Sequence, residues 1–395
     1  MRNWLLPEYI EDVLPPEAER MERLRSRLLT LFRGYGYHLV APPLLEYTES
    51  LLTGTGHDLD LRTFKLVDQL SGRMMGVRAD ITPQVARIDA HLLNQSGVTR
   101  LCYCGPVLHT RPRGMNVTRE PMQIGAELYG HAGIEADLEI LRLLGESVSA
   151  CGVVGARVDI GHVGVFRTLI RRAGIDPDLE AQLHRAMAAK DSEALSQRTA
   201  ALDPVIGAAL VAMTGLYGDR SILQKAAKVL PPYPEIVAAL QDLARLAAAS
   251  DLPVIIDLAD LRGYQYHSGA VFAVYAPGMP NALALGGRYD EVGAAFGRAR
   301  PATGFSMDLR DLARIIEPSL PARGILAPWG EGQALMAKIA ELRAAGEVVI
   351  QALSASGQSG HVAGASPVES GLPYVLECDR ELVLQGDQWI LRRKG

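Results

Sequence analysis

LCYCGPVLHTRPRGMNVTREPMQIGAELYG, residues 101–130, is the stretch that decides the fold. A run rich in Val, Leu, Tyr and Cys ends at Gly105-Pro106, a polar loop with several Arg residues follows, and a second apolar run spans Met122 to Tyr129. This composition predicts two strands joined by a long basic loop. Gln123 and Glu127 lie an even number of positions apart, so they point to one face of the second strand.

That polar face is unusual because the rest of the second strand is apolar. Burying Gln123 and Glu127 is unfavourable unless each side chain finds a hydrogen-bonding partner. One interpretation is a polar cavity that binds a ligand or catalyses a reaction. The other is a buried polar pair whose hydrogen bonds are satisfied within the protein for structural reasons. Both remain open at this point.

The amino-acid composition limits the classes of protein to which this chain can belong. The chain has 395 residues, 48% hydrophobic and 22% charged, with a net charge of -5. This predicts two or three domains of an ordinary globular protein and argues against a basic nucleic-acid-binding surface. Acidic residues interrupt the apolar residues near the N-terminus, and no window is apolar for long enough to span a membrane. We therefore expect no signal peptide, no membrane span and a cytoplasmic location.

The four cysteines do not form a recognisable metal motif. Cys102 and Cys104 are two residues apart on a predicted strand, and Cys151 and Cys378 stand alone. Because no second Cys pair or nearby His accompanies them, we expect free thiols and no zinc site.

Helical and extended segments alternate along the chain. The apolar spacing predicts helices over Glu17–Tyr35 and Ile134–Cys151 and a hairpin over 63–77. A helix follows Asp80 and Thr82, with Pro83 in its first turn. The region 167–249 is rich in Ala and Leu and is predicted to be a helical insertion, either a packed domain or a surface that holds a partner. Further expected segments are strands over 157–163, 254–258 and 269–275, a Gly-Gly turn within 285–292, and a strand that passes into a helix over 303–314.

The C-terminal part has a different organisation. Pro318 and Pro321 predict a linker, and a strand, a helix over Gly332–Ala345 and further strands follow from Arg323 onward. We therefore expect a core domain over 1–320 and a small α/β domain over 321–395. The low-complexity segment 354–366 is expected to be a mobile loop.

Three separate segments carry side chains suited to an amino acid. Asp80 and Thr82 offer a carboxylate and a hydroxyl to an ammonium group. Arg262, within RGYQYHSG, is suited to a bidentate grip on a carboxylate, although it is equally explained as a surface or ion-pair arginine. Gln123 and Glu127 complete an amino-acid pocket. We find none of the common phosphate-loop, HExxH or GxSxG motifs in the sequence.

The order of these segments resembles the histidyl-tRNA synthetase branch of the class II synthetases. Residues 37–46 resemble motif 1, residues 105–130 motif 2, and residues 303–312 motif 3. RADIT at 78–82 is similar to the family's RPEGT, RGYQYHSGAVF to its RGLDYYTGTVF, and GGRYD at 286–290 is identical to the family's form. The resemblance covers about residues 5–315 and implies an α+β fold, in which helices flank a mostly antiparallel sheet. It also implies dimerisation through motif 1.

The chain departs from the synthetase pattern at the residues that bind ATP. His109, expected in a loop, stands where motif 2 has an Arg that holds the α-phosphate. Asp311 stands where motif 3 has its ATP-binding Arg, with Arg310 shifted by one, and Asp308 replaces a Gly. Removing one contact to developing charge typically costs about 3 kcal/mol in the transition state. The tail beyond Arg323 also lacks the basic balance needed to grip RNA.

This combination resembles the ATP phosphoribosyltransferase regulatory subunits, a family related to the synthetases, which share ADITPQVAR and REPxQxGAE. The resemblance implies a non-catalytic chain of histidine biosynthesis without cofactor or tRNA. It implies a homodimer within a hetero-oligomer, with a short-form catalytic subunit as partner and histidine as effector. The complex would be a glycosyltransferase. The alternative is a divergent histidyl-tRNA synthetase that forms histidyl-adenylate.

The resemblance also implies a set of binding residues. Those expected to contact a histidine-like ligand are Asp80, Thr82, Gln123, Glu127, Arg262, Tyr266, His267 and Tyr289. His267 is expected to line the pocket or the core rather than to catalyse. Arg111, Arg113 and Arg119 form either a solvated loop or a contact to an anion such as phosphate. Whether histidine binds in this pocket or at a subunit interface stays open.

Overall fold

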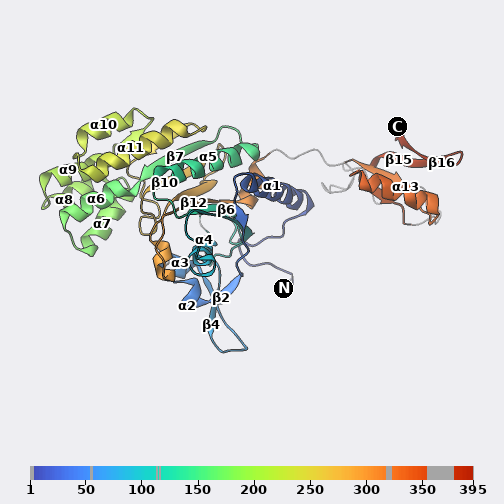
Figure 1. Ribbon diagram of the computed structural model, residues 1–395, viewed down its shortest axis with the longest axis horizontal. Helices are drawn as coiled ribbons and strands as arrows, with labels where there is room; N and C mark the ends of the chain where they lie inside the picture. Colours follow the sequence, from blue (N-terminus) through green and yellow to red (C-terminus); the bar gives the residue numbers. More distant parts are fainter. Residues whose placement is uncertain are drawn as a thin grey trace. The chain divides into compact units, whose positions relative to one another are not determined.

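The computed structural model describes residues 4–53, 57–112, 114, 117–316, 323–353 and 378–394, and leaves aside the side chains of residues 57 and 58. The chain forms two compact units, one containing Met21–Ile316 and the other containing the residues that follow (Figure 1). Within the described residues, no helix is long and apolar enough to cross a membrane.

A nine-stranded sheet organises the larger unit, within the described part of the chain. Its order is β1-β5-β6-β12-β11-β10-β7-β9-β8, and all neighbours are antiparallel except the pairs β1/β5 and β7/β9. This confirms the mostly antiparallel sheet that the sequence predicts. The strands are β1 (His38–Leu39), β5 (Thr99–Pro106), β6 (Met122–Tyr129), β7 (Arg157–His162), β8 (Tyr217–Gly218), β9 (Val254–Asp257), β10 (Ala270–Tyr275), β11 (Ala284–Arg288) and β12 (Ala302–Asp308).

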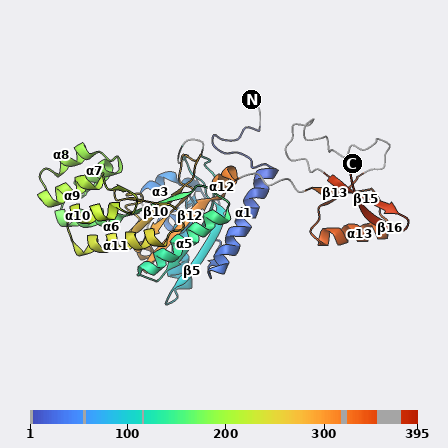
Figure 2. The same cartoon turned by 90° about the horizontal axis from the view of Figure 1, so that it is seen from above.

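One face of the sheet packs on long helices, as Figures 1 and 2 show. Helix α1 (Pro15–Gly34) contributes Leu28 and Phe32, and α5 (Ile134–Ala150) adds its own buried leucines. Ile124, Ala126 and Leu128 of β6 belong to the same core. Because side chains alternate along a strand, Gln123 and Glu127 point to the opposite face, as predicted.

The opposite face is covered by α4 (Thr82–Arg87) and the short π-helix η1 (Ile88–Leu93). Val85 of α4 belongs to the same buried cluster as Leu101 and Tyr103 of β5 and Tyr289, which directly follows β11. The predicted hairpin is confirmed as β3 (Phe64–Val67) and β4 (Met74–Val77), which form a small antiparallel sheet with β2 (Leu45–Tyr47). Short helices α2 (Thr48–Leu51) and α3 (His57–Arg62) complete this region.

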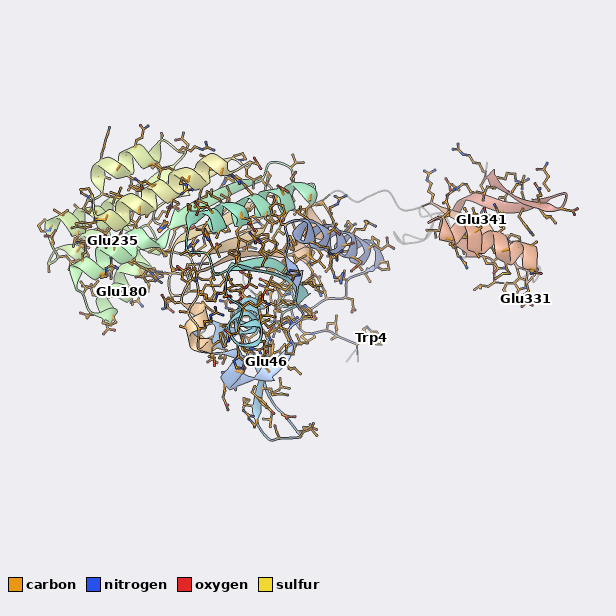
Figure 3. The ribbon with its side chains drawn as sticks, in the orientation of Figure 1. Trp4, Glu46, Glu180, Glu235, Glu331 and Glu341 are labelled. Atoms are coloured by element: carbon orange, nitrogen blue, oxygen red, sulfur yellow. The ribbon has the colours of Figure 1, made fainter. Side chains whose placement is uncertain are left out.

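The Ala-rich region between β7 and β9 is helical, as predicted, apart from the short β8. Its helices are α6 (Val163–Ala173), α7 (Pro177–Ala188), α8 (Ser192–Thr199), α9 (Pro204–Met213), α10 (Ile222–Val229) and α11 (Pro234–Ala249). Glu180 of α7 and Glu235 of α11 are labelled in Figure 3. Glu235 forms ion pairs with Arg171 and Arg172 of α6. Glu180 accepts a hydrogen bond from Tyr264 at 2.8 Å, so the loop that carries Arg262 is tied to the insertion.

The prediction of a Gly-Gly turn within 285–292 is wrong. Gly286 and Gly287 lie inside β11, which pairs with β10 on one side and β12 on the other. A Cβ atom on Gly286 would lie 2.2 Å from the Phe272 ring. The first glycine therefore serves close packing between strands rather than a reversal of the chain. The predicted strand-to-helix passage is confirmed as β12 followed by α12 (Leu309–Ile315), after the 3-10 helix η2 (Val292–Phe296).

The smaller unit has its own core. Its elements are β13 (Gly324–Ala327), α13 (Gln333–Ala344), β14 (Val349–Gln351), β15 (Cys378–Gln385) and β16 (Gln388–Arg393), with the sheet order β14-β13-β15-β16. Ile325, Ile339 and Leu382 are buried together. The loop expected over 354–366 and the linker prolines lie outside the described residues.

Candidate functional site

Glu127 is the centre of a buried polar cluster on the inner face of β6. Its side chain is 1% exposed. Tyr103 of β5 donates a hydrogen bond to Oε1 at 3.0 Å, and Thr82 donates to the same oxygen at 3.1 Å. The hydroxyl of Tyr289 donates to Oε2. Glu127 thus gathers hydroxyl donors from three elements that are far apart in the sequence.

Glycine on the neighbouring strand makes room for this carboxylate. Gly304 of β12 lies directly opposite Glu127, and a Cβ atom at Gly304 would lie 1.6 Å from Glu127 Oε2. Gly125 has the same role on β6, where a Cβ atom would lie 2.5 Å from the Tyr103 hydroxyl. Only glycine fits at such close approaches.

Burial controls the charge of Glu127. Removal from water raises its pKa from 4.5 to about 8, while the hydrogen bonds from Tyr289, Tyr103 and Thr82 oppose the rise. Near neutral pH a large share of this carboxyl group is therefore protonated. A cationic or hydrogen-bond-donating ligand group would favour its ionised form and lower the pKa.

Gln123 and Asp80 form a second part of the same site. Gln123 accepts a hydrogen bond from the Ile81 backbone N–H at 2.9 Å and donates to Asp80 Oδ1 at 2.9 Å. The same Asp80 oxygen accepts the backbone N–H of Thr82 at 3.0 Å. The start of α4 is thereby fastened to β6, and Thr82 is oriented toward Glu127.

Three aromatic residues expected in the site also meet. The rings of Tyr266 and Tyr289 lie 5.0 Å apart, and those of Tyr266 and His267 lie 5.3 Å apart. The buried hydroxyl of Tyr266 has no hydrogen-bond partner among the described residues. His267 donates from Nδ1 to the backbone carbonyl of Arg288 at 3.2 Å, and burial lowers its pKa to about 4. His267 is therefore a neutral lining residue.

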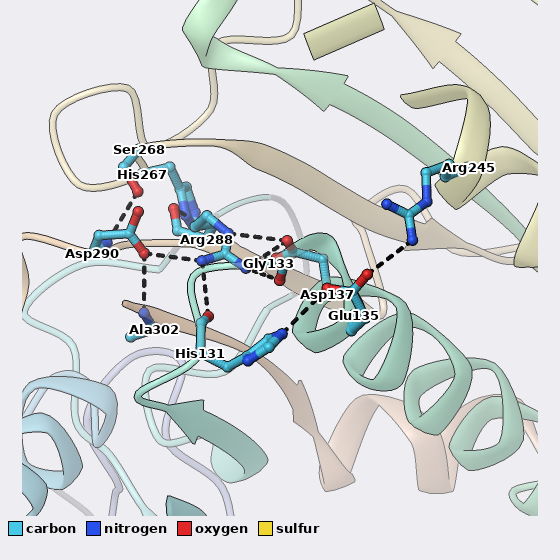
Figure 4. A network of polar contacts seen from close by, with 10 residues as sticks. All are labelled: His131, Gly133, Glu135, Asp137, Arg245, His267, Ser268, Arg288, Asp290 and Ala302. Atoms are coloured by element: carbon cyan, nitrogen blue, oxygen red, sulfur yellow. Dashed lines mark hydrogen bonds and ion pairs between the residues drawn. The ribbon is translucent and has the colours of Figure 1, made fainter. Parts of the chain in front are cut away.

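A buried ion pair fixes the strand end that carries Tyr289, as Figure 4 shows. Arg288 donates to Asp137 Oδ2 of α5 at 2.7 and 3.0 Å, and to the carbonyls of His131 and Gly133. Asp290 follows Tyr289, and its Oδ1 accepts the Ala302 N–H at 3.0 Å. Arg288 thus binds the strand end to α5, and Tyr289 is held between two anchored residues.

Arg262 lies outside the contacts that join this cluster. It donates to both carboxylate oxygens of Asp260, from Nε at 2.8 and 3.0 Å, and to the Tyr275 hydroxyl at 2.8 Å. These contacts agree with the interpretation of Arg262 as an ion-pair arginine. A ligand carboxylate would have to compete with Asp260 for this guanidinium.

His109 lies between β5 and β6, in the region expected to be a loop. It is buried there: it is 0% exposed, and its Nε2 lies 2.9 Å from the Ala79 carbonyl. Arg119 donates from Nε to the His109 carbonyl at 3.0 Å and lies over the Phe64 ring. Arg111 is exposed, and Arg113 lies outside the described residues. The imidazole that replaces a phosphate-binding Arg is thus a packing residue.

The end of β12 is likewise used for structure. Asp308 accepts the backbone N–H groups of Arg310 at 2.9 Å and Met122 at 3.0 Å, so it caps α12 and joins it to β6. Burial raises its pKa to about 7. Arg310 donates to Glu120 at 3.1 Å. Both side chains are engaged within the protein.

Sequence reasoning missed Tyr103, Arg288 and Asp137. The alternation along β5 was available as a signal for Tyr103, because Leu101 and Tyr103 share a face. It became informative only with the register, in which Tyr103 lies opposite Gly125. Within the described residues no group of His, Cys, Asp and Glu side chains is arranged to hold a metal ion.

Comparisons with known proteins agree on the family. The sequence pattern of the histidyl-tRNA synthetase family matches residues 9–312, and that of the ATP phosphoribosyltransferase subunit HisZ C-terminal domain matches residues 322–392. ATP phosphoribosyltransferase regulatory subunits of Ralstonia nicotianae and Janthinobacterium sp. are 57% and 55% identical to this chain. The alignments cover 99% and 100% of this chain and 98% and 100% of those proteins.

Solved structures share the fold. An ATP phosphoribosyltransferase regulatory subunit/histidyl-tRNA synthetase from Bacillus halodurans aligns with a TM-score of 0.80 and 25% identity, over 96% of this chain and 99% of that one. A histidyl-tRNA synthetase from a Nostoc species aligns with a TM-score of 0.76 at 18% identity, over 100% of this chain and 95% of that one, which supports the fold alone. The chain belongs to the family of ATP phosphoribosyltransferase regulatory subunits, with a core of the histidyl-tRNA synthetase type.

Proposed function

We propose that this chain is the non-catalytic regulatory subunit of an ATP phosphoribosyltransferase in histidine biosynthesis. It would activate a short-form catalytic subunit and carry the feedback response to histidine. The observation that supports this best is a contrast between two groups of residues. The Glu127 cluster keeps its hydroxyl donors, whereas His109 and Asp308, which stand at positions of the synthetase ATP-binding motifs, are engaged in packing and capping.

We infer that the Glu127 cluster binds an amino acid with an imidazole side chain. Glu127 and the free Tyr266 hydroxyl offer an acceptor and a second polar group to a ring N–H. Asp80 and Thr82 would receive the ammonium group, in competition with the hydrogen bonds that they form within the protein. A ligand that binds one state of the assembly more tightly shifts the population toward that state, which is the physical basis of feedback inhibition.

Two assays test this function. The chain should co-purify with a short-form catalytic subunit, and phosphoribosyl transfer between ATP and phosphoribosyl diphosphate should require both chains and fall when histidine is added. The chain alone should give no histidine-dependent ATP–pyrophosphate exchange. Clear exchange by the isolated chain would instead establish a divergent synthetase and would sink the regulatory proposal.

We further propose that the chain forms a homodimer through the motif 1 region. Strand β1 is one of the two edge strands of the large sheet within the described residues, so its outer backbone groups are available for pairing. Exposed apolar side chains, which are typical of interfaces, occur in β1, in and just before β2, in the β3–β4 hairpin and in η1. They are Leu39, Leu44, Leu45, Leu66, Val67, Leu70, Leu92 and Leu93.

A paired substitution checks the dimer. Leu39→Asp combined with Leu44→Asp places two charges on this surface and should convert the dimer to a monomer, because desolvating the charges opposes association. Light scattering after gel filtration measures the mass. Val154→Asp is the matched control, since Val154 is 87% exposed on a different loop, and should leave the dimer intact. A monomeric parent chain, or an unchanged dimer in the double variant, contradicts the proposal.

A further inference from the structure

A second cavity lies apart from the Glu127 cluster. It has a volume of about 620 Å³ and is bounded by the N-terminal segment Tyr9–Glu11, Val117 and Thr118, the loop 278–281, and helix α12. Cavities of this size commonly hold small organic molecules. None of the residues that line it contacts Glu127 in the hydrogen-bond network described above.

Asp311 is the charged group of this cavity that lacks a hydrogen-bonding partner. It lines the cavity from the first turn of α12, is 9% exposed, and accepts no hydrogen bond from any described residue. Burial raises its pKa, and the charge of Arg314 opposes the rise. A buried carboxylate without a donor is unfavourable, so a ligand that supplies a donor would be stabilised here.

Among the described residues, other charged groups around the cavity have partners of their own. Arg314 forms an ion pair with Glu11. Arg310 donates to Glu120 and to the Glu11 carbonyl, and the Thr118 hydroxyl donates to the Tyr9 carbonyl at 3.2 Å. The charge of Arg314 also acts on Asp311, but among the described residues no donor forms a hydrogen bond with the Asp311 carboxylate.

The remaining lining supplies an apolar wall and one amide. Val117 and Met279 offer apolar surface, and Asn281 lines the same space. We propose that this cavity is a binding site for a small organic amine, whose ammonium group pairs with Asp311 while its apolar body packs against Val117 and Met279. Such a site is separate from the amino-acid pocket and does not depend on the function proposed for that pocket.

The test uses benzylamine as the probe and the full-length chain as the protein. Isothermal titration calorimetry at neutral pH should show saturable binding. Benzyl alcohol, which has the same shape without the charge, should bind at least tenfold more weakly, and phenylacetate should not bind. Asp311→Asn should weaken benzylamine binding at least tenfold. Glu49→Gln, on an exposed helix of the same unit, should bind benzylamine as the parent does.

A second variant tests whether Asp311 has only a structural role at the start of α12. Met279→Trp fills the cavity and retains the carboxylate, so it should abolish benzylamine binding while the melting temperature stays within a few degrees of the parent. Equal binding of benzylamine and benzyl alcohol, equal binding by the parent and Asp311→Asn, or full binding by Met279→Trp would each overturn the proposal.

Discussion

Replacing Glu127 with Gln is expected to weaken histidine binding by about 100-fold, because hydrogen bonds to a charged group contribute about 1.5–3 kcal/mol in a buried site. Calorimetric titration of the isolated chain with histidine measures the affinity directly. Glu49→Gln, whose side chain is 80% exposed, is the matched control and should bind like the parent. If Glu127→Gln binds histidine unchanged, the effector site lies elsewhere, for instance at a subunit interface.

Glu127→Gln should also change how the stability of the protein depends on pH. The pKa of Glu127 in the folded chain is about 8, above its usual value of 4.5. The folded state therefore binds this proton more tightly than the unfolded state. The resulting stability is fully present below pH 4.5 and is lost as the pH rises through 8.

Urea unfolding at pH 5, 7 and 9 measures this contribution. The free energy of unfolding of the parent should fall by about 4 kcal/mol more than that of Glu127→Gln across this range. Because histidine favours the ionised carboxylate, its binding should also release a proton, which titrations in buffers of different ionisation enthalpy detect. Parallel pH curves for the two proteins would show that Glu127 is ionised in the ligand-free pocket.

Replacing Arg288 with Ala is expected to lower the free energy of unfolding by about 3–5 kcal/mol. The side chains of Arg288 and Asp137 are 9% and 3% exposed, so the substitution leaves a carboxylate buried without its partner. Denaturant unfolding measures the loss. Arg245→Ala breaks an exposed pair in the same network, where the partner Glu135 is 62% exposed, and should cost less than about 1 kcal/mol.

A double variant separates the ion pair from simple loss of packing. Arg288→Met combined with Asp137→Leu removes both charges together and should recover most of the stability that Arg288→Ala loses, because an apolar pair often replaces a buried ion pair without penalty. Histidine affinity should fall in Arg288→Ala, since Tyr289 is displaced from Glu127. A loss in Arg288→Ala no larger than that in Arg245→Ala would show that the pair does not hold this strand.

Local periodicity was sufficient to predict much of the core unit. The alternation along β6 placed Gln123 and Glu127 on one face of the strand, and the helical spacing of apolar residues predicted α1 and α5. It failed at Gly286-Gly287, because a glycine pair favours a turn locally while the close packing of Phe272 requires it within a strand. A tertiary contact overrode a local preference.

Local sequence patterns could not predict the hydrogen-bond partners of the site residues. Hydrogen bonds from Tyr103 and Tyr289 reach Glu127 from positions 24 and 162 residues away, and depend on strand register. Arg262 has the sequence context of a carboxylate-binding residue, yet Asp260 two residues earlier takes its guanidinium. His109 lies in a polar stretch, and only the approach of Ala79 buries it.

By itself, the sequence determined the polar face of β6, because this depends on residue type and on short-range spacing, and its resemblance to the histidyl-tRNA synthetases implied the fold class and the departures from the ATP-binding motifs. The tertiary structure alone decided which donors surround Glu127, how Arg288 anchors Tyr289, and that Asp311 is left without a partner in its cavity. These depend on strand register and on burial, which arise from contacts between segments that are far apart in the chain.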